Sequence, residues 1–282
     1  MNEDLLKLNK ICGKAYRKAK NWYQRYVGCQ IMALFFAIST FGFDYGAKIS
    51  ALITLFGVFA SEFCRWRSDV WKSNSDWAKG RLEVVDGFGV SVDKEELRDW
   101  LADCPENFLD DVTDDEIRGS EFASKEPPGP RRAVENTRES AWWSKFLARK
   151  MILYLSLLLL FFLVGGFFAL MICICELKSA DAKQGLSVVQ TVGCIICSVW
   201  AFILSINALR LIFDYFSFAR EADEILHRCK MLLKSGNLSV QEASATMHDY
   251  QTARSARPLM PTFVWRWHKK HLNHLWKEFS SE

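Results

Sequence analysis

The chain has 282 residues, of which 50% are hydrophobic and 24% charged, and its formal net charge is +3. Its apolar residues are concentrated in a few long runs, which excludes a plain globular enzyme and favours several membrane spans with modest soluble segments. Residues 93–126 hold 13 acidic and 4 basic side chains, so the remainder carries about +12. These basic residues border the apolar runs, where an anionic lipid leaflet attracts them. Because no nucleic-acid-binding motif is present, we expect no direct nucleic acid partner.

Residues 1–26 predict an amphipathic helix. One face of this helix is apolar and lysines and arginines surround it, a pattern typical of a helix lying on a membrane surface. The apolar face consists of Leu8, Cys12, Ala15, Ala19, Trp22 and Tyr26. We expect this helix to anchor the chain on the cytoplasmic side and to lead into the first span.

Four apolar runs predict four transmembrane helices, since a span needs about 17 to 25 residues. The runs are residues 27–43, 49–64, 151–175 and 188–213. The sequence therefore predicts an all-α membrane protein with two transmembrane hairpins, at 27–65 and 149–213. A cytoplasmic insert with an acidic linker occupies 66–148, and a cytoplasmic helical tail occupies 214–282.

The orientation of the spans follows from the positions of Lys and Arg. Basic residues lie before the first span, after the second, before the third and after the fourth, whereas the opposite loops, 44–48 and 176–187, are short and nearly neutral. Because cytoplasmic loops carry the excess of Lys and Arg, both termini and the insert are expected to face the cytoplasm.

The fourth run carries a seam of small residues that allows another helix to approach closely. They recur every fourth position: Gly193, Cys197, Ala201 and Ser205. Packing within one bundle and packing between subunits of a homo-oligomer are both open interpretations.

At the inner end of the same run, Asn207, Arg210 and Asp214 lie at helical spacing. Arg210 and Asp214 can therefore form an ion pair. This pair is interpreted either as an interfacial pair that reaches the aqueous phase or as a cytoplasmic gate.

The soluble segments predict further helices. Residues 67–88 and 91–104 are compatible with helices, and the second helix is expected to begin at Ser91 or Asp93. The acidic stretch that follows the second helix, as far as residue 126, is predicted to be a solvated loop. Residues 133–150 predict a helix that runs into the third span, with Trp142 and Trp143 as aromatic anchors at the interface.

The tail predicts three helical pieces. The first continues from the fourth span and breaks at Gly236 and Asn237; the second starts with Ser239 and Glu242 in capping-box positions and ends near Ala256. The last, after Pro261, is amphipathic and aromatic.

The sequence gives no sign of catalysis, metal or cofactor. The nine cysteines suit apolar packing, and the C-x-x-C at Cys194 and Cys197 has no second pair at zinc-site spacing. Three histidines, His268, His271 and His274, recur every third residue, so on a helix they point in successively different directions and do not suit a shared metal ion. With no phosphate loop and no nucleophile elbow, we expect a protein that is not an enzyme.

Four segments around the predicted spans resemble the SMODS-associating four-transmembrane effectors of bacterial CBASS antiphage operons. They are "KAYRKAKNW", "AKGRLEVVDGFGV", "VENTRESAWWSKFLARK" and "YQTARSARPLMPTFVW". The resemblance implies a bacterial inner-membrane effector that senses a cyclic oligonucleotide made by a partner nucleotidyltransferase of the CD-NTase type. On sensing, such an effector oligomerises or rearranges and disrupts the membrane, for instance by pore formation. A constitutive channel or transporter, and a membrane scaffold for a partner enzyme, are the alternatives.

The segment around Gln251, Arg254 and Arg257 has two interpretations. In one, these residues cap a helix end and pair with acidic residues of the insert. In the other, the arginines meet phosphates and Trp265 or Trp77 stacks on a base, since guanidinium groups and aromatic faces suit those partners. The candidate ligand-binding residues are Gln251, Arg254, Arg257, Trp265, Trp77 and Arg81.

Overall fold

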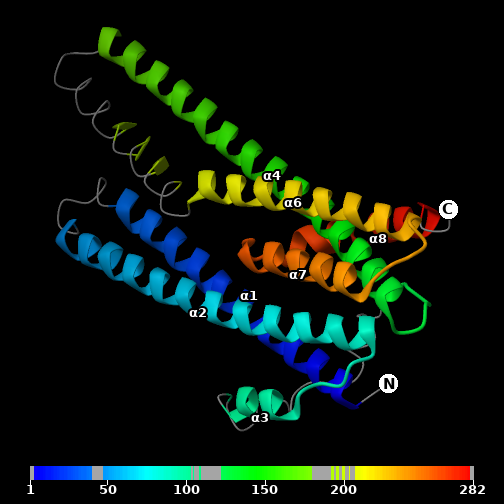
Figure 1. Ribbon diagram of the computed structural model, residues 1–282. Coiled ribbons are helices and arrows are strands. Elements are labelled where there is room, and N and C mark those ends of the chain that lie inside the picture. Colours follow the sequence, from blue (N-terminus) through cyan, green and yellow to red (C-terminus); the bar gives the residue numbers. More distant parts are fainter. Residues whose placement is uncertain are drawn as a thin grey trace. The chain divides into compact units, whose positions relative to one another are not determined.

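The computed structural model describes residues 3–39, 47–102, 104, 108, 122–179, 192–193, 195–196, 199–200, 203 and 207–279. Within these residues the protein is all-helical, as predicted (Figure 1). The helices are α1 (Glu3–Ser39), α2 (Ala47–Phe88), α3 (Lys94–Ala102), α4 (Pro130–Ser179), α6 (Ala208–Lys234), α7 (Val240–Ala256) and α8 (Thr262–Phe279).

The chain divides into two compact units. The polar unit consists of residues 1–20, 69–150 and 214–282, and the apolar unit consists of residues 21–68 and 151–213. Helices α1, α2, α4 and α6 each contribute residues to both units without interruption. The prediction that the helix over residues 133–150 runs into the third apolar run is therefore confirmed.

One hydrophobic cluster of the polar unit is built by α1, α2 and α3, together with Val92 between α2 and α3. The buried side chains that pack together are Leu8, Ile11, Ala78, Leu82, Val85, Val92 and Leu97. Leu8, Ile11, Ala15 and Ala19 are 0% exposed, so protein covers the apolar face of the N-terminal helix. The prediction that this helix lies on the membrane surface is therefore wrong: an apolar stripe gains the same burial energy from α2 and α3 as from lipid.

Helix ends in the polar unit follow local chemistry. Asp93 Oδ1 accepts the Glu95 N–H at 2.9 Å and starts α3, and Ser239 with Glu242 forms the predicted capping box of α7. Gly89 and Gly236 follow α2 and α6 with φ of 72° and 71°. This backbone conformation suits glycine, which explains the break predicted at Gly236.

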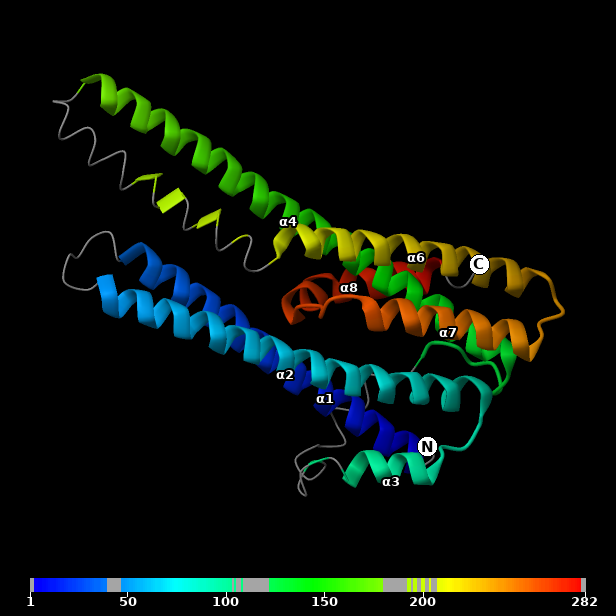
Figure 2. The ribbon, with the colours of Figure 1, turned by 60° about the vertical axis from the view of Figure 1, so that its left-hand side comes forward.

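The described part of the apolar unit turns large side chains outward and small or polar ones inward. Helices α1 and α2 run side by side (Figures 1 and 2). Between them the buried Gln30 Nε2 donates to Ser61 Oγ at 2.7 Å, and Gly57 faces Ala33. Phe35, Phe56 and Phe59 are 65%, 75% and 68% exposed. This arrangement is typical of helices packed in lipid.

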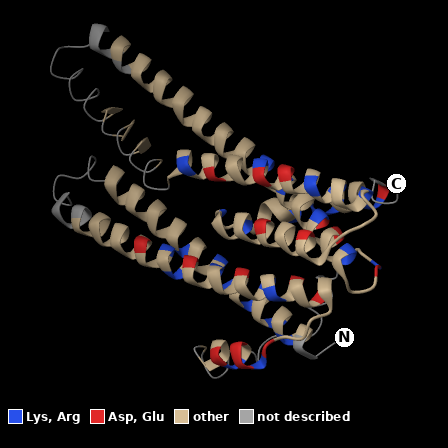
Figure 3. Ribbon diagram, in the orientation of Figure 1, with Lys and Arg blue, Asp and Glu red and all other residues tan. Residues whose placement is uncertain are grey.

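One helix among the described residues, Pro130–Ile172 of α4, is long and apolar enough to cross a membrane. Figure 3 shows its apolar portion without Lys, Arg, Asp or Glu. No other helix among the described residues passes this test, and residues 40–43 of the first predicted span and much of the fourth lie outside those residues. Most of the predicted acidic loop also lies outside the described residues. Of the small-residue seam only Gly193 is described; Cys197, Ala201 and Ser205 lie outside the described residues.

We expect Gly87→Ala to destabilise the polar unit. A Cβ at Gly87 would lie 3.0 Å from Cα and Cβ of Ala133 on α4 and 3.3 Å from Met247 Cε on α7. Overpacking of this kind costs about 1 to 3 kcal/mol. Gly13→Ala is the matched control, because nothing lies within 4 Å of its added Cβ, and a helical Gly→Ala change stabilises by about 0.5 to 1 kcal/mol. Thermal unfolding of both variants in detergent tests this; equal melting temperatures would contradict the close approach.

Candidate functional site

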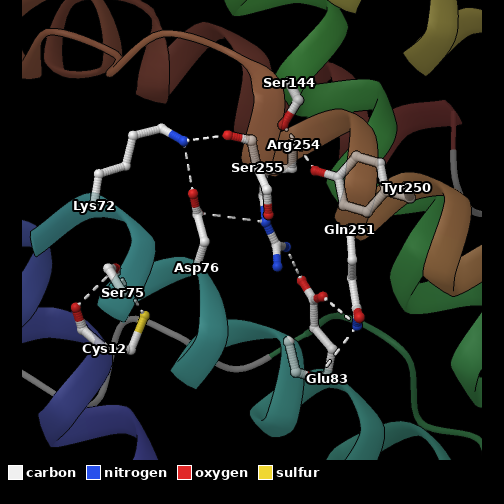
Figure 4. Close-up of polar contacts among 11 residues, drawn as sticks. Cys12, Lys72, Ser75, Asp76, Glu83, Ser144, Tyr250, Gln251, Arg254 and Ser255 are labelled. Atoms are coloured by element: carbon white, nitrogen blue, oxygen red, sulfur yellow. Dashed lines mark hydrogen bonds and ion pairs between the residues drawn. The ribbon is translucent and has the colours of Figure 1, made fainter. Parts of the chain in front are cut away.

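A buried ion pair joins α7 to α2 in the polar unit. Arg254 Nη1 bonds Glu83 Oε1, and both residues are 4% exposed. The other Glu83 oxygen accepts from Gln251 Nε2 at 3.2 Å, and the same amide nitrogen lies 3.2 Å from the Gly80 carbonyl oxygen. Figure 4 shows these side chains converging between the two helices. We call Glu83, Gln251 and Arg254 the charge centre.

Two further contacts hold α7 in place. Lys72 Nζ donates to Asp76 Oδ2 at 2.8 Å and to the Ser255 carbonyl at 2.7 Å, so a cation lies at the carbonyl end of α7, where the helix dipole favours it. The buried hydroxyls of Ser144 on α4 and Tyr250 on α7 lie 2.9 Å apart (Figure 4). Helix α7 is thus fixed by polar contacts to both α2 and α4.

The charges of the centre determine its protonation. Burial by itself lowers the pKa of Arg254, but Glu83, Tyr250 and Asp76 together outweigh burial, and the net shift is upward. Arg254 is therefore permanently charged. Its Nε lies 3.8 Å from Asp76 Oδ1, yet Nε and Nη2 have no hydrogen-bond partner in the described part of the protein. A buried cation satisfied mainly by one carboxylate depends strongly on that partner.

The structure therefore places Gln251 and Arg254 in internal contacts with the insert. This is the arrangement in which they pair with its acidic residues, here Glu83 and Asp76. For either residue to contact a ligand, the charge centre would have to open.

Three of the other four ligand candidates lie in two further places. Trp77 Nε1 donates to Glu96 Oε1 at 3.1 Å and Arg81 Nη2 bonds the same oxygen at 2.5 Å; Trp77 also stacks on Trp100. Trp265 is 39% exposed, with Lys269 Nζ 4.4 Å from its ring centroid. The six candidates thus do not converge on one site.

A third group of charges involves Arg257 and was missed by sequence reasoning. Arg257 and Arg266 both act on Lys20, whose pKa is lowered to about 8, first by burial and then by the charges of Arg266 and Arg257. None of these three cations has a carboxylate within 4.0 Å among the described residues. Because Lys20 is far from Arg266 in the sequence, no local pattern could have joined them.

The inner end of the fourth predicted span departs from a continuous helix. Asn207 has φ of 52° and its carbonyl accepts the Leu211 N–H at 2.9 Å, so α6 starts at Ala208. Asparagine tolerates this left-handed conformation better than most residues. The expectation of one unbroken helix from the fourth span into the tail is therefore wrong at this residue. Arg210 and Asp214 lie in the first turns of α6, and their role as interfacial pair or gate stays a prediction.

No group of three or more His, Cys, Asp or Glu side chains is placed to hold a metal ion within the described residues. Trp142, predicted to be an interfacial anchor, packs on Trp276 of α8 with ring centroids 5.2 Å apart.

Comparisons with protein-family models, curated proteins and solved structures find no match to this chain.

A double-mutant cycle tests the charge centre. We expect Glu83→Gln alone to destabilise the protein by about 3 to 5 kcal/mol, because it leaves the Arg254 cation buried without its carboxylate. Adding Arg254→Met should recover part of that loss, since it removes the unpaired charge. Arg81→Met is the control, because its pair with Glu96 is about half exposed and exposed pairs contribute about 0 to 1 kcal/mol. Urea unfolding in detergent measures the parent, Glu83→Gln, Arg254→Met, the double variant and the control, and strictly additive effects of the two central changes would contradict the pair.

Proposed function

We propose that this protein is a membrane-embedded antiphage effector, which senses a cyclic oligonucleotide on its cytoplasmic side and then oligomerises or rearranges to disrupt the bacterial inner membrane. The observation that carries the proposal is that the four segments behind the resemblance to the CBASS effectors, far apart in the sequence, contact one another in the polar unit. Four segments that pack together are more readily explained as parts of one functional module than as four unrelated segments.

The contacts link each segment to another. Tyr16 of the first donates to the Met260 carbonyl of the fourth at 3.4 Å. Glu83 of the second bonds Gln251 and Arg254 of the fourth. Asn136 of the third donates to Asp86 of the second at 2.7 Å. The hydroxyls of Ser144 and Tyr250 join the third to the fourth. The fourth segment is therefore central to the module.

The proposed membrane region has four transmembrane helices in two hairpins. For the first hairpin, the support is the outward phenylalanines of α1 and α2 and the buried bond between Gln30 and Ser61. For the second hairpin, the support is the uncharged portion of α4 and the apolar run at 188–213. Lys and Arg at the ends of these runs favour both termini and residues 66–148 in the cytoplasm.

Continuous helices give the module a means of acting on the spans. Because α1, α2, α4 and α6 contribute residues to both units, a shift between helices in the polar unit can be passed along these shared helices to the apolar unit. A ligand can drive such a shift only to the extent that it binds one arrangement more tightly than the other.

Cysteine labelling tests the topology. In the cysteine-free protein, single cysteines introduced at residues 179–185 should react with a membrane-impermeant maleimide added to intact cells. A cysteine at position 111 should react only after permeabilisation, because the Lys and Arg bias places the insert inside. Labelling of position 111 in intact cells would overturn the topology.

Liposome leakage tests the activity. The purified full chain, reconstituted in liposomes loaded with a quenched dye, should release the dye on addition of one member of a panel of cyclic di- and trinucleotides. The matching linear nucleotide should be inactive. Release without any nucleotide would instead indicate a constitutive channel or transporter, and retention of the dye with every nucleotide would contradict the effector and leave the scaffold.

A further inference from the structure

Helix α8 has a buried face and an exposed face of different chemistry. Val264 and Leu272 are 0% and 5% exposed, so protein covers the side of the helix on which they lie. The opposite side carries two exposed rings near the start of the helix, Phe263 at 46% and Trp267 at 68%. These rings are about one turn apart and meet edge to face, with centroids 5.1 Å apart. The exposed face therefore begins with an aromatic pair.

The face that carries the aromatic pair is also basic. Arg266 follows Phe263 by three positions and Lys270 follows Trp267 by three, so both cations lie on this side of the helix. Both are exposed. Among the described residues of α8 the one acidic residue is Glu278, about three turns beyond Trp267. Exposed aromatic rings beside cations, with no acid nearby on the helix, are typical of a surface at the headgroup level of a bilayer.

Hydrogen bonds tie the start of α8 to residues that lie close to an apolar run in the chain. Tyr215 of α6 donates to the Leu259 carbonyl at 2.9 Å, three residues before α8 begins. The fourth apolar run ends at residue 213, so Tyr215 is only about 3 Å further along. Tyr16 of α1 donates to the next carbonyl, that of Met260, at 3.4 Å. The first turn of α8 is thus fixed beside the point where α6 leaves the apolar run.

The far end of α8 contacts residues more distant from an apolar run. Trp276 packs on Trp142 of α4 with ring centroids 5.2 Å apart, and the Arg138 guanidinium lies 5.4 Å from the Trp276 ring centroid. The third apolar run starts at residue 151, which places Trp142 and Arg138 about 14 and 20 Å before it along the helix. The aromatic pair is therefore at the end of α8 nearer to the apolar runs, and cations such as Lys270 follow it.

This order of side chains matches the layers of a membrane surface, in which aromatic rings occupy the interface and Lys and Arg reach the phosphates. We propose that the exposed face formed by Phe263, Arg266, Trp267 and Lys270 docks on the headgroups of anionic phospholipids in the cytoplasmic leaflet. We call it the lipid-docking face.

Charge decides between lipid and a second copy of the chain as the occupant of this face. Two copies meeting through the same face would bring Arg266 and Lys270 against their own counterparts, which is unfavourable. An anionic leaflet neutralises both cations and accepts the aromatic rings as well. The inference rests on the membrane setting of the proposed function, and it requires no nucleotide.

Photo-crosslinking of the full chain identifies what covers the lipid-docking face. The aromatic photo-crosslinker p-benzoylphenylalanine is introduced at Phe263 or at Trp267, and the protein is placed in nanodiscs with equal amounts of phosphatidylcholine and phosphatidylglycerol. His274 is the matched control position, because it lies on the same face, its side chain is 77% exposed, and it is about 10 Å farther along α8 than Trp267. Phe161, exposed on the uncharged portion of α4, is the control for the membrane setting.

After irradiation, mass spectrometry should find phospholipid adducts at Phe263 and Trp267 and far fewer at His274. Phosphatidylglycerol should be enriched about fivefold or more among the adducts, the factor that one well-placed Lys or Arg gives at an anionic surface.

Two charge variants test the origin of this enrichment. In the chain labelled at Trp267, Arg266→Gln/Lys270→Gln should lower the phosphatidylglycerol share to that of the disc. The control Arg98→Gln/Lys230→Gln removes two exposed cations elsewhere in the polar unit and should keep the enrichment. All four positions are exposed, so the unfolding temperatures of both variants should match the parent.

Three results would overturn the lipid-docking face. They are adducts that join two chains at Phe263 or Trp267, lipid adducts at these positions no more frequent than at His274, and lipid adducts without enrichment in phosphatidylglycerol. The Phe161 control separates this inference from the proposed function. Lipid adducts at Phe161 with none on α8 would contradict the lipid-docking face alone, whereas their absence at Phe161 as well would contradict the membrane setting on which both rest.

Discussion

The polar unit depends on the buried ion pair between Arg254 and Glu83. Helix α7 has few large apolar side chains to bury, since Ala243, Thr246 and Ala253 are among its inward residues. Its attachment to α2 therefore relies on polar contacts, with Gln251 reaching the Gly80 carbonyl and Lys72 closing the carbonyl end. Breaking a buried pair costs far more than forming it contributes. Helix α7 is thus held in one place, but the loss of either partner would leave the other charge buried and unpaired, and would weaken this attachment.

The placement of α7 fixes where the elbow between α7 and α8 begins. Pro258 and Pro261 restrict the backbone after Ala256, and Tyr16 and Tyr215 anchor the intervening carbonyls. Arg254, in the last turn of α7, and Arg257, its C-cap, therefore lie three residues apart where α7 ends and the elbow begins. One arginine is neutralised inside the protein, and the other has no such carboxylate among the described residues. A ligand drawn to the second would act on a helix whose position the first maintains.

The apolar unit follows the opposite packing rule. Its buried polar contact, from Gln30 to Ser61, lies between helices, while phenylalanines such as Phe56 and Phe161 are exposed. In water this distribution would be unfavourable, because exposed apolar area costs about 25 cal/mol per Å². In a lipid environment the same side chains carry no such cost, and close contact at Gly57 and Ala33 stabilises the pair. The helices shared by both units join these two kinds of packing in one chain.

Much of this protein was determined by local sequence. The capping box at Ser239, the break at Gly236 and the passage of 133–150 into α4 each follow from interactions among near neighbours, so they could be read directly. Tertiary structure decided the rest. An apolar stripe such as Leu8 to Ala19 does not reveal whether protein or lipid covers it. Arg254 and Arg257 occur in one repeating pattern, yet only the approach of α2 brings a carboxylate to the first. Tyr16 reaches the Met260 carbonyl only because the elbow lies against α1. The physical reason is the same in each case: helix formation depends on residues a few positions apart, whereas burial and charge pairing depend on which distant segments come together.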